Sequence, residues 1–161
     1  MSIRLRHLAI AIALLLLLAG VGVWLFVYLG IYNVAATRQH IPIVYQLLDY
    51  AMFRSVAAES KDITAPKDLH EPRRIRAGVA TYREQCLQCH GAPAVSPGAL
   101  AFGMSPAPVN LLSAAREWES KHIFWVVKHG AKMTGMPAWE YRLTDEQIWD
   151  VVAFVKAMAA M

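Results

Sequence analysis

Cysteine is scarce in this chain of 161 residues, because Cys86 and Cys89 are its only two. A structural zinc site needs four ligands, and a second ligand pair at zinc-finger spacing is missing. A thioredoxin-like redox site would follow a strand, whereas the residues before Cys86 have a helical pattern and no strand pattern lies nearby. A disulfide across so short a gap would close a small, strained loop. These three uses of the pair are therefore disfavoured.

Charged residues are also few, at 17% of the chain against 57% hydrophobic residues. So large an apolar share exceeds what an ordinary soluble domain of this size contains, and we expect part of it to serve a membrane. The net charge of +4 is mild, and the sequence has no nucleic-acid-binding motif. An acidic protein partner or an anionic membrane surface suits this charge better than nucleic acid does.

The two cysteines belong to the motif Cys86-Leu87-Gln88-Cys89-His90, which is C-x-x-C-H. Two thiols one helical turn apart can hold a haem through two thioether bonds, and the neighbouring imidazole can then bind the iron. The motif predicts one covalently attached haem c, with Cys86 and Cys89 as its attachment points and His90 as an axial ligand.

The N-terminal segment has the pattern of a membrane anchor. Arg4, Arg6 and His7 precede an uncharged run that extends from Leu8 to Tyr32. A helix of about 20 apolar residues crosses the hydrocarbon core, whereas the apolar core of a cleaved signal peptide has only about 7–15 residues. We therefore expect residues 1–32 to be a retained signal anchor. The basic residues before the span predict a cytoplasmic N-terminus and an exported remainder.

Residues 33–72 are expected to hold a juxtamembrane helix and a linker. Apolar residues recur at roughly helical spacing between Ile41 and Ser60. This helix either lies at the membrane surface or docks a partner protein, or it merely packs on the haem domain, and the sequence does not separate these alternatives. The stretch from Lys61 to Pro72 is polar and contains two prolines, which is typical of a linker.

Residues 73–161 then form the haem domain, whose first helix we place at about Arg73–Cys86. The stretch Gly91–Pro108 is rich in proline and glycine and is expected to be a loop around the haem. Within it, the carbonyl of Pro108, or equally that of Pro106, is our candidate acceptor for the second ring N–H of His90.

The second half of the domain is expected to be helical. One or two short helices should fill Ala115–His129, where Trp125 is either core or a donor to a haem propionate. The run from Thr144 to Gln147 is a capping box and predicts the start of the last helix. Its buried residues should be Ile148, Val151, Val152 and Val155, flanked by Trp149 and Phe154.

A thioether sulfur suits the second axial position of the haem iron. Met136 lies between Gly135 and Pro137, a sharp and rigid loop able to hold its sulfur, so we take it as the second ligand. Met133 and Met104 are the alternative methionines. His129 would instead give an iron with two histidine ligands.

C-x-x-C-H, followed by Gly-Met-Pro-Ala-Trp and a capped terminal helix, resembles a class I cytochrome c over residues 73–161. The resemblance implies an all-α fold with Gly78 and Tyr82 of the first helix crossing Val151 and Phe154 of the last. It also implies a single haem c and its ligand set: Cys86 and Cys89 as the thioether cysteines, His90 as the proximal ligand and Met136 as the distal ligand. The anchor resembles that of bacterial membrane-tethered monohaem cytochromes.

By this resemblance the chain is an electron carrier rather than an enzyme, held at the bacterial inner membrane with its haem domain in the periplasm. Its partners would be redox proteins such as a quinol–cytochrome c reductase, a terminal oxidase or a periplasmic dehydrogenase. It is then either a tethered shuttle or a fixed subunit of a respiratory complex. Lys121, Lys128 and Lys132 either steer an acidic partner to the haem edge or are ordinary solvated lysines.

The alternative function is haem chemistry, meaning a gas sensor or a peroxidase. Either activity needs an open or readily vacated distal position and a polar distal residue. A well-placed Met136 argues against both.

Overall fold

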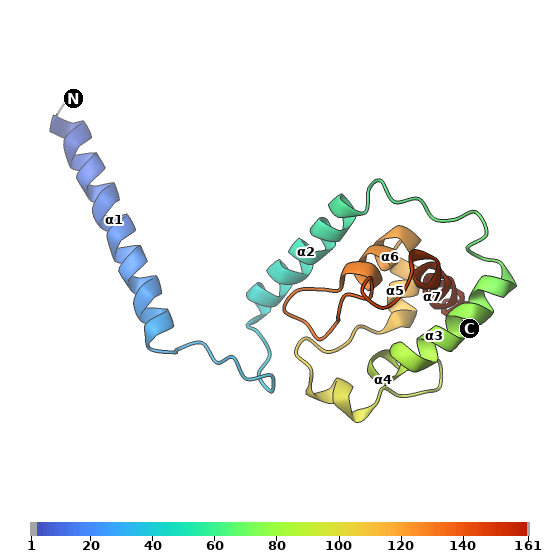
Figure 1. Cartoon of the computed structure of the whole chain (residues 1–161). Coiled ribbons are helices and arrows are strands. Elements are labelled where there is room, and N and C mark those ends of the chain that lie inside the picture. The colour runs from blue at the N-terminus through green and yellow to red at the C-terminus, as the bar shows by residue number, and fades with distance from the viewer. Residues whose placement is uncertain (1–2, 161) are drawn as a thin grey trace. The chain divides into compact units, whose positions relative to one another are not determined.

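The computed structural model describes residues 3–160. Within these residues, helices joined by loops are the only regular elements, and there is no strand (Figure 1). The elements are α1 (Ile3–Tyr28), α2 (Pro42–Glu59), α3 (Pro72–Gln85), α4 (Leu87–His90), the 3₁₀-helix η1 (Ala99–Gly103), α5 (Leu111–Glu117), α6 (Ser120–His129) and α7 (Asp145–Met158). The all-α prediction is confirmed. The chain divides into two compact units, Met1–Arg38 and Gln39–Met161.

The first unit contains α1, whose 26 residues include no buried side chain. An 18-residue window of this helix has a mean hydropathy of 2.8, so α1 is long and apolar enough to cross a membrane by length and composition. Near its end, the rings of Trp24 and Tyr28 stack with their centroids 5.0 Å apart. Aromatic side chains of this kind favour the membrane–water interface.

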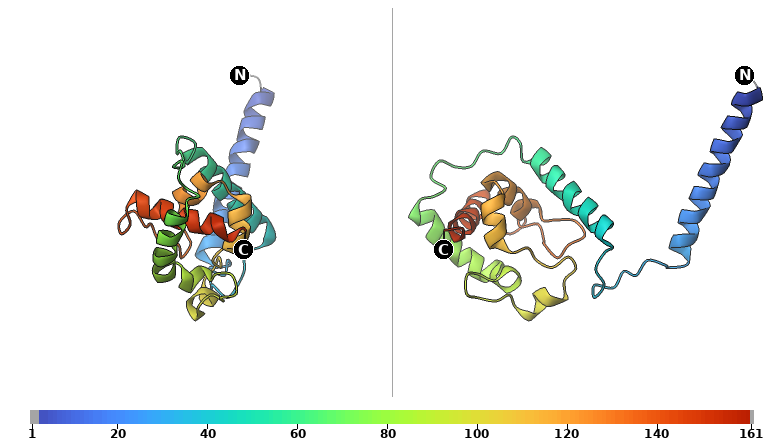
Figure 2. Two further views of the ribbon diagram at one scale, coloured as in Figure 1. Left: turned by 90° about the vertical axis from the view of Figure 1, so that its right-hand side faces the viewer. Right: turned by 180° about the vertical axis from the view of Figure 1, so that it is seen from behind.

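The second unit is built on the crossing of α3 and α7, which lie against each other in both orientations of Figure 2. A Cβ atom added at Gly78 would lie 1.9 Å from the carbonyl oxygen of Asp150, so the two backbones touch where α3 has no side chain. Beside this contact, the rings of Tyr82 and Phe154 pack edge to face at 5.0 Å. The predicted crossing of Gly78 and Tyr82 with the last helix is confirmed.

Helix α7 begins where the sequence placed it. Thr144 accepts a hydrogen bond from the backbone N–H of Gln147, whose side chain accepts one from the Thr144 backbone, and this completes the capping box. The four residues of the predicted stripe are fully buried, and the flanking Trp149 and Phe154 are buried as well. Burial of this many apolar side chains makes α7 the centre of the domain, with α5 and α6 packed against it.

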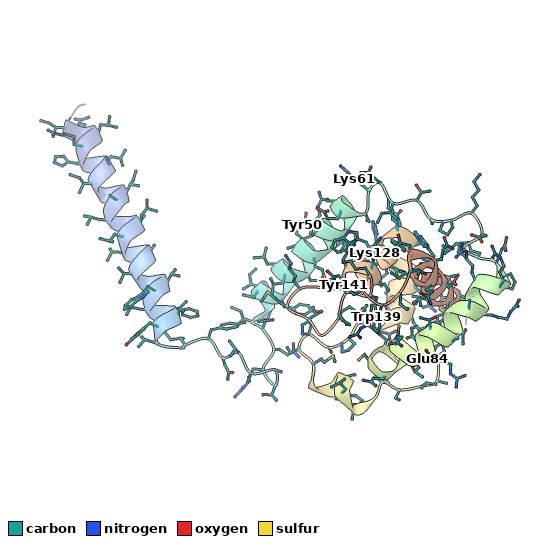
Figure 3. All side chains as sticks on the ribbon, in the orientation of Figure 1. Tyr50, Lys61, Glu84, Lys128, Trp139 and Tyr141 are labelled. Carbon is teal, nitrogen blue, oxygen red and sulfur yellow. The ribbon has the colours of Figure 1, made fainter. Side chains whose placement is uncertain are left out.

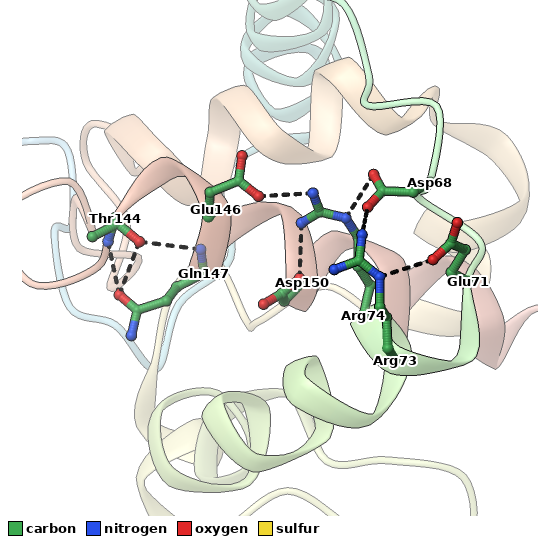
Figure 4. A network of polar contacts seen from close by, with 8 residues as sticks. All are labelled: Asp68, Glu71, Arg73, Arg74, Thr144, Glu146, Gln147 and Asp150. Carbon is green, nitrogen blue, oxygen red and sulfur yellow. Dashed lines mark hydrogen bonds and ion pairs between the residues drawn. The ribbon is translucent and has the colours of Figure 1, made fainter.

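Arg74 on α3 links three parts of the chain (Figure 4). It donates hydrogen bonds to Asp150 at 2.9 Å and Glu146 at 2.7 Å, both on α7. Its Nε also forms an ion pair at 2.9 Å with Asp68, although this contact is not an aligned hydrogen bond. Because Leu69 is buried in the core, the stretch before α3 is packed onto the domain.

Candidate functional site

The C-x-x-C-H motif occupies the junction of α3 and α4. Cys86 ends α3, and Cys89 and His90 lie in the single turn of α4 that follows it. Both thiols are free and half-buried. Burial raises the pKa of the Cys86 thiol to about 12. The junction therefore presents two unpaired thiols and one imidazole from adjacent turns.

The end of the motif is fixed by Tyr82 and Gly91. The Tyr82 hydroxyl donates a hydrogen bond of 2.5 Å to the Gly91 carbonyl, and both groups are buried. Gly91 has φ +63°, and an added Cβ would lie 2.5 Å from the Val95 carbonyl oxygen. Only glycine suits this turn, which takes the chain sharply away from His90.

The orientation of His90 is set by a backbone carbonyl. Its Nδ1 lies 3.1 Å from the carbonyl oxygen of Val109. The predicted acceptor, Pro108 or Pro106, was wrong, because the chain turns so that the carbonyl of the residue after Pro108 faces the ring. When Nδ1 donates this bond, Nε2 has its lone pair free for a metal. Burial lowers the pKa of His90, which favours the neutral, ligating form.

A cavity of about 200 Å³ adjoins the imidazole. Its walls come from the chain around His90, from the loop after it, from the start of α5 and from the end of α7. Apolar side chains line most of it: Ala92, Pro93, Val95, Pro97, Pro108, Val109, Leu111, Leu112 and Met158. Such a lining suits the face of an apolar macrocycle.

The segment that carries Met136 folds back over the end of α6. Gly130 has φ +68°, and an added Cβ would meet the backbone of Met136, Pro137 and Ala138 at 2.7–2.8 Å. The Ala131 N–H donates to the Met136 carbonyl at 3.2 Å, and the Met136 N–H donates to the Thr134 hydroxyl at 3.0 Å. These bonds close a tight loop over residues 131–136 with Met136 at its end, in keeping with the loop that the Gly-Met-Pro sequence predicts.

The three candidate methionines have different surroundings. Met133 is 86% exposed, so its sulfur faces solvent. Met136 is half-buried and packs against the core. The Met104 sulfur would lie 2.8 Å from a Cβ added at Gly135, so Met104 packs on the same loop. Axial ligation by Met136 stays a prediction, with Met104 as its neighbour.

His129, the alternative ligand, is engaged elsewhere. Its Nδ1 lies 3.5 Å from a carboxylate oxygen of Glu140, and its ring packs at 5.1 Å from that of Trp125. These contacts hold both residues on one side of α6. Neither Trp125 nor His129 lines the cavity beside His90.

Trp139 is a residue whose role the sequence did not reveal. It is 6% exposed and belongs to the core, and Figure 3 labels it in the haem domain. Its indole Nε1–H is buried and has no hydrogen-bond partner among the described residues, 3–160. A buried donor left unpaired costs about 1–3 kcal/mol, so a native partner is expected. The motif contained Trp139, but only the packing exposes the unpaired donor.

Two of the three lysines considered for partner steering have acidic neighbours. Lys128 pairs with Asp145 at 2.8 Å, and Lys121 lies 3.3 Å from Glu119. Lys132 is exposed on the Met136 loop. The positive charge near this loop is therefore smaller than a count of lysines suggests.

The residues present fit a covalently bound haem. Two free thiols, an imidazole with one nitrogen engaged and a thioether on a tight loop are the donor types that a c-type haem requires. The orphaned Trp139 N–H matches the carboxylate of a haem propionate. Over residues 3–160, no group of three or more His, Cys, Asp or Glu side chains could hold a metal ion, so the zinc alternative gains no support there.

Comparison with protein families gives an independent result. Residues 73–155, more than half of the chain, match the family model described as cytochrome c oxidase, cbb3-type, subunit III. The matched segment contains both cysteines, His90, Met136 and Trp139. A comparison with curated proteins finds no match.

Proposed function

Because this chain belongs to the cbb3-type cytochrome c oxidase subunit III family, we propose that it is a membrane-tethered class I monohaem cytochrome. The family consists of c-type cytochromes, which carry covalently bound haem c and transfer electrons. The observation that carries the proposal is the C-x-x-C-H turn, with both thiols free and the His90 ring oriented by Val109. The bound haem supplies a centre that accepts and returns one electron.

Each residue of the site has a distinct task in this proposal. Cys86 and Cys89 would hold the haem through thioethers, and His90 would bind the iron through Nε2. Met136 would supply a thioether ligand, and this soft sulfur would favour the reduced state. Trp139 would donate its N–H to a haem propionate and so stabilise the ionised carboxylate. A Met136 sulfur bound to the iron would occupy the second axial position, which favours electron transfer over gas binding or peroxidase chemistry.

The proposed domain plan has an anchor at 1–32, a juxtamembrane segment at 33–72 and the haem domain at 73–161. Helix α1 would cross the bacterial inner membrane once, with the basic residues Arg4 and Arg6 on the cytoplasmic side and the haem domain in the periplasm. The family description supports a respiratory oxidase complex as the partner, with the chain as its subunit or as a tethered shuttle to it.

Single and double serine variants of Cys86 and Cys89 test the covalent attachment. In denaturing gels stained for haem, the unaltered chain should keep its haem in the membrane fraction. The double variant should lose all of it, and each single variant should keep one thioether and show weaker staining because less haem becomes attached. Full haem staining of the double variant would contradict the proposal. Recovery of the unaltered chain in the soluble fraction would contradict the tether alone.

A further inference from the structure

Helix α2 has one side attached to the haem domain. The Phe53 ring packs edge to face against Trp118 and His122, with ring centroids 5.8 and 6.2 Å away. One turn later Val56 is buried, and at the end of the helix the buried Ser60 hydroxyl donates to the Val56 carbonyl at 2.6 Å. The C-terminal half of α2 is thus held on α6 and the segment before it.

The other side of α2 is apolar and exposed. Ile43, Leu47 and Tyr50 are 68%, 65% and 64% exposed, and their spacing places them on one side of the helix. Arg54 continues this row one turn further on. Leu48 and Tyr45 are exposed as well, but their spacing places them on other sides of the helix. Figure 3 labels Tyr50 on this helix.

The haem domain covers one side of α2, whereas the row of Ile43, Leu47 and Tyr50 is left exposed. An exposed apolar row of this kind normally marks contact with a second apolar environment. Residues 29–41 connect this helix to the proposed membrane span, and extended chain covers at most about 3.6 Å per residue, which keeps α2 within about 47 Å of the end of α1. The bilayer that α1 is proposed to cross is an apolar environment that α2 can meet within that reach.

The composition of the outer side also suits a bilayer surface. Tyrosine favours the membrane–water interface, and an arginine such as Arg54 can extend its charge to the headgroups while its stem stays among the lipid chains. The charged residues of α2 are Asp49, Arg54 and Glu59, so the helix has no excess positive charge to bind anionic lipid. Attachment would therefore depend on apolar contact.

We propose that α2 lies in the membrane surface, with Ile43, Leu47 and Tyr50 among the lipid chains. Its packing through Phe53 then holds the haem domain against the membrane in one orientation rather than leaving it free on a flexible tether. This inference rests on the proposed anchoring of the chain by α1.

Nitroxide spin labels on the full-length, haem-loaded protein in phosphatidylcholine nanodiscs test the proposal. Because both native cysteines are committed to the haem, Leu47→Cys provides a unique labelling site. Leu15→Cys in α1 is the lipid control, and Glu84→Cys on α3, which is exposed, is the aqueous control. Collisions with oxygen report lipid exposure, and collisions with a water-soluble nickel chelate report water.

We expect the label at Leu47 to collide with oxygen several-fold more often than with the chelate, as at Leu15, and the label at Glu84 to show the reverse. The same result is expected with anionic lipid added. Water exposure at Leu47 together with lipid exposure at Leu15 would overturn the inference alone. Protection from both reagents at Leu47 would indicate a protein partner and would also overturn it. Water exposure at Leu15 would instead contradict the proposed anchor.

Discussion

Gly78 is the position where the fold leaves least room for change. An added Cβ would lie 1.9 Å from the carbonyl oxygen of Asp150, 2.5 Å from its carbon and 3.1 Å from the Cβ of Phe154. Two of these atoms are backbone atoms of α7, so no side-chain rotation relieves the contact. The Gly78→Ala variant must separate α3 from α7, and the buried side chains around the crossing lose contact.

The magnitude follows from two opposing effects. Overpacking a core costs typically about 1–3 kcal/mol, and a clash with backbone belongs at the upper end. Alanine in a helix interior gains about 1 kcal/mol over glycine. The clash is the larger effect, so the free energy of unfolding should fall by about 2 kcal/mol, and Tm should fall by about 8–16 °C for a domain of this size.

The assay is thermal unfolding of the haem-loaded protein, monitored through the circular dichroism of the haem band. Gly103→Ala is the matched control, because an added Cβ there meets no atom within 4 Å. We expect the control to melt at or slightly above the temperature of the unaltered protein. A Gly78→Ala variant as stable as the control would refute the close approach of α3 and α7.

Three further predictions follow from particular side chains. Tyr82→Phe leaves the buried Gly91 carbonyl without its donor and should cost about 1–3 kcal/mol in urea unfolding; an unchanged midpoint would contradict the role of the hydroxyl. Trp139→Phe removes the unpaired N–H, so the pKa of the haem propionate should rise. The pH dependence of the reduction potential should then move to higher pH, and an unchanged pH dependence would exclude this contact. The Arg74 guanidinium beside Asp68 lowers the pKa of that carboxyl. The carboxylate therefore stabilises the fold above its unfolded pKa of about 3.9, and this stabilisation is lost as the pH falls through the lower folded value. The stability difference between the unaltered protein and Asp68→Asn should accordingly be full at about pH 6 and shrink below about pH 4; a difference independent of pH would contradict this pairing.

Much of the fold could be predicted because local patterns determine it. The capping box at Thr144 and the apolar stripe after it specify α7 without any tertiary information. The C-x-x-C-H spacing likewise specifies a helical turn that carries two thiols and an imidazole. The missing side chain of Gly78 predicts that the last helix approaches closely there. The residues that Gly78 meets on that helix came from the resemblance, since a lone glycine does not by itself name the residue it contacts.

Features that depend on packing could not be predicted. The acceptor for His90 is the Val109 carbonyl rather than that of Pro108, because the direction of each carbonyl in a proline-rich loop depends on how the whole loop packs. The unpaired Trp139 N–H became visible only when its neighbours were placed. The stretch from Lys61 to Pro72, which was expected to be a linker, is fixed on the domain by the ion pair between Asp68 and Arg74. No local sequence pattern connects these two residues.

The identity of the second axial ligand is the central claim, and one optical measurement tests it most directly. Spectra are recorded on membranes that contain the chain, first ferric and then ferrous with carbon monoxide. We expect a weak near-infrared sulfur-to-iron band that disappears in the Met136→Ala variant, and little carbon monoxide uptake by the unaltered protein. Ready carbon monoxide binding at neutral pH, or a band indifferent to Met136, would contradict electron transfer through a His90–Met136 haem and would favour gas sensing or peroxidase chemistry.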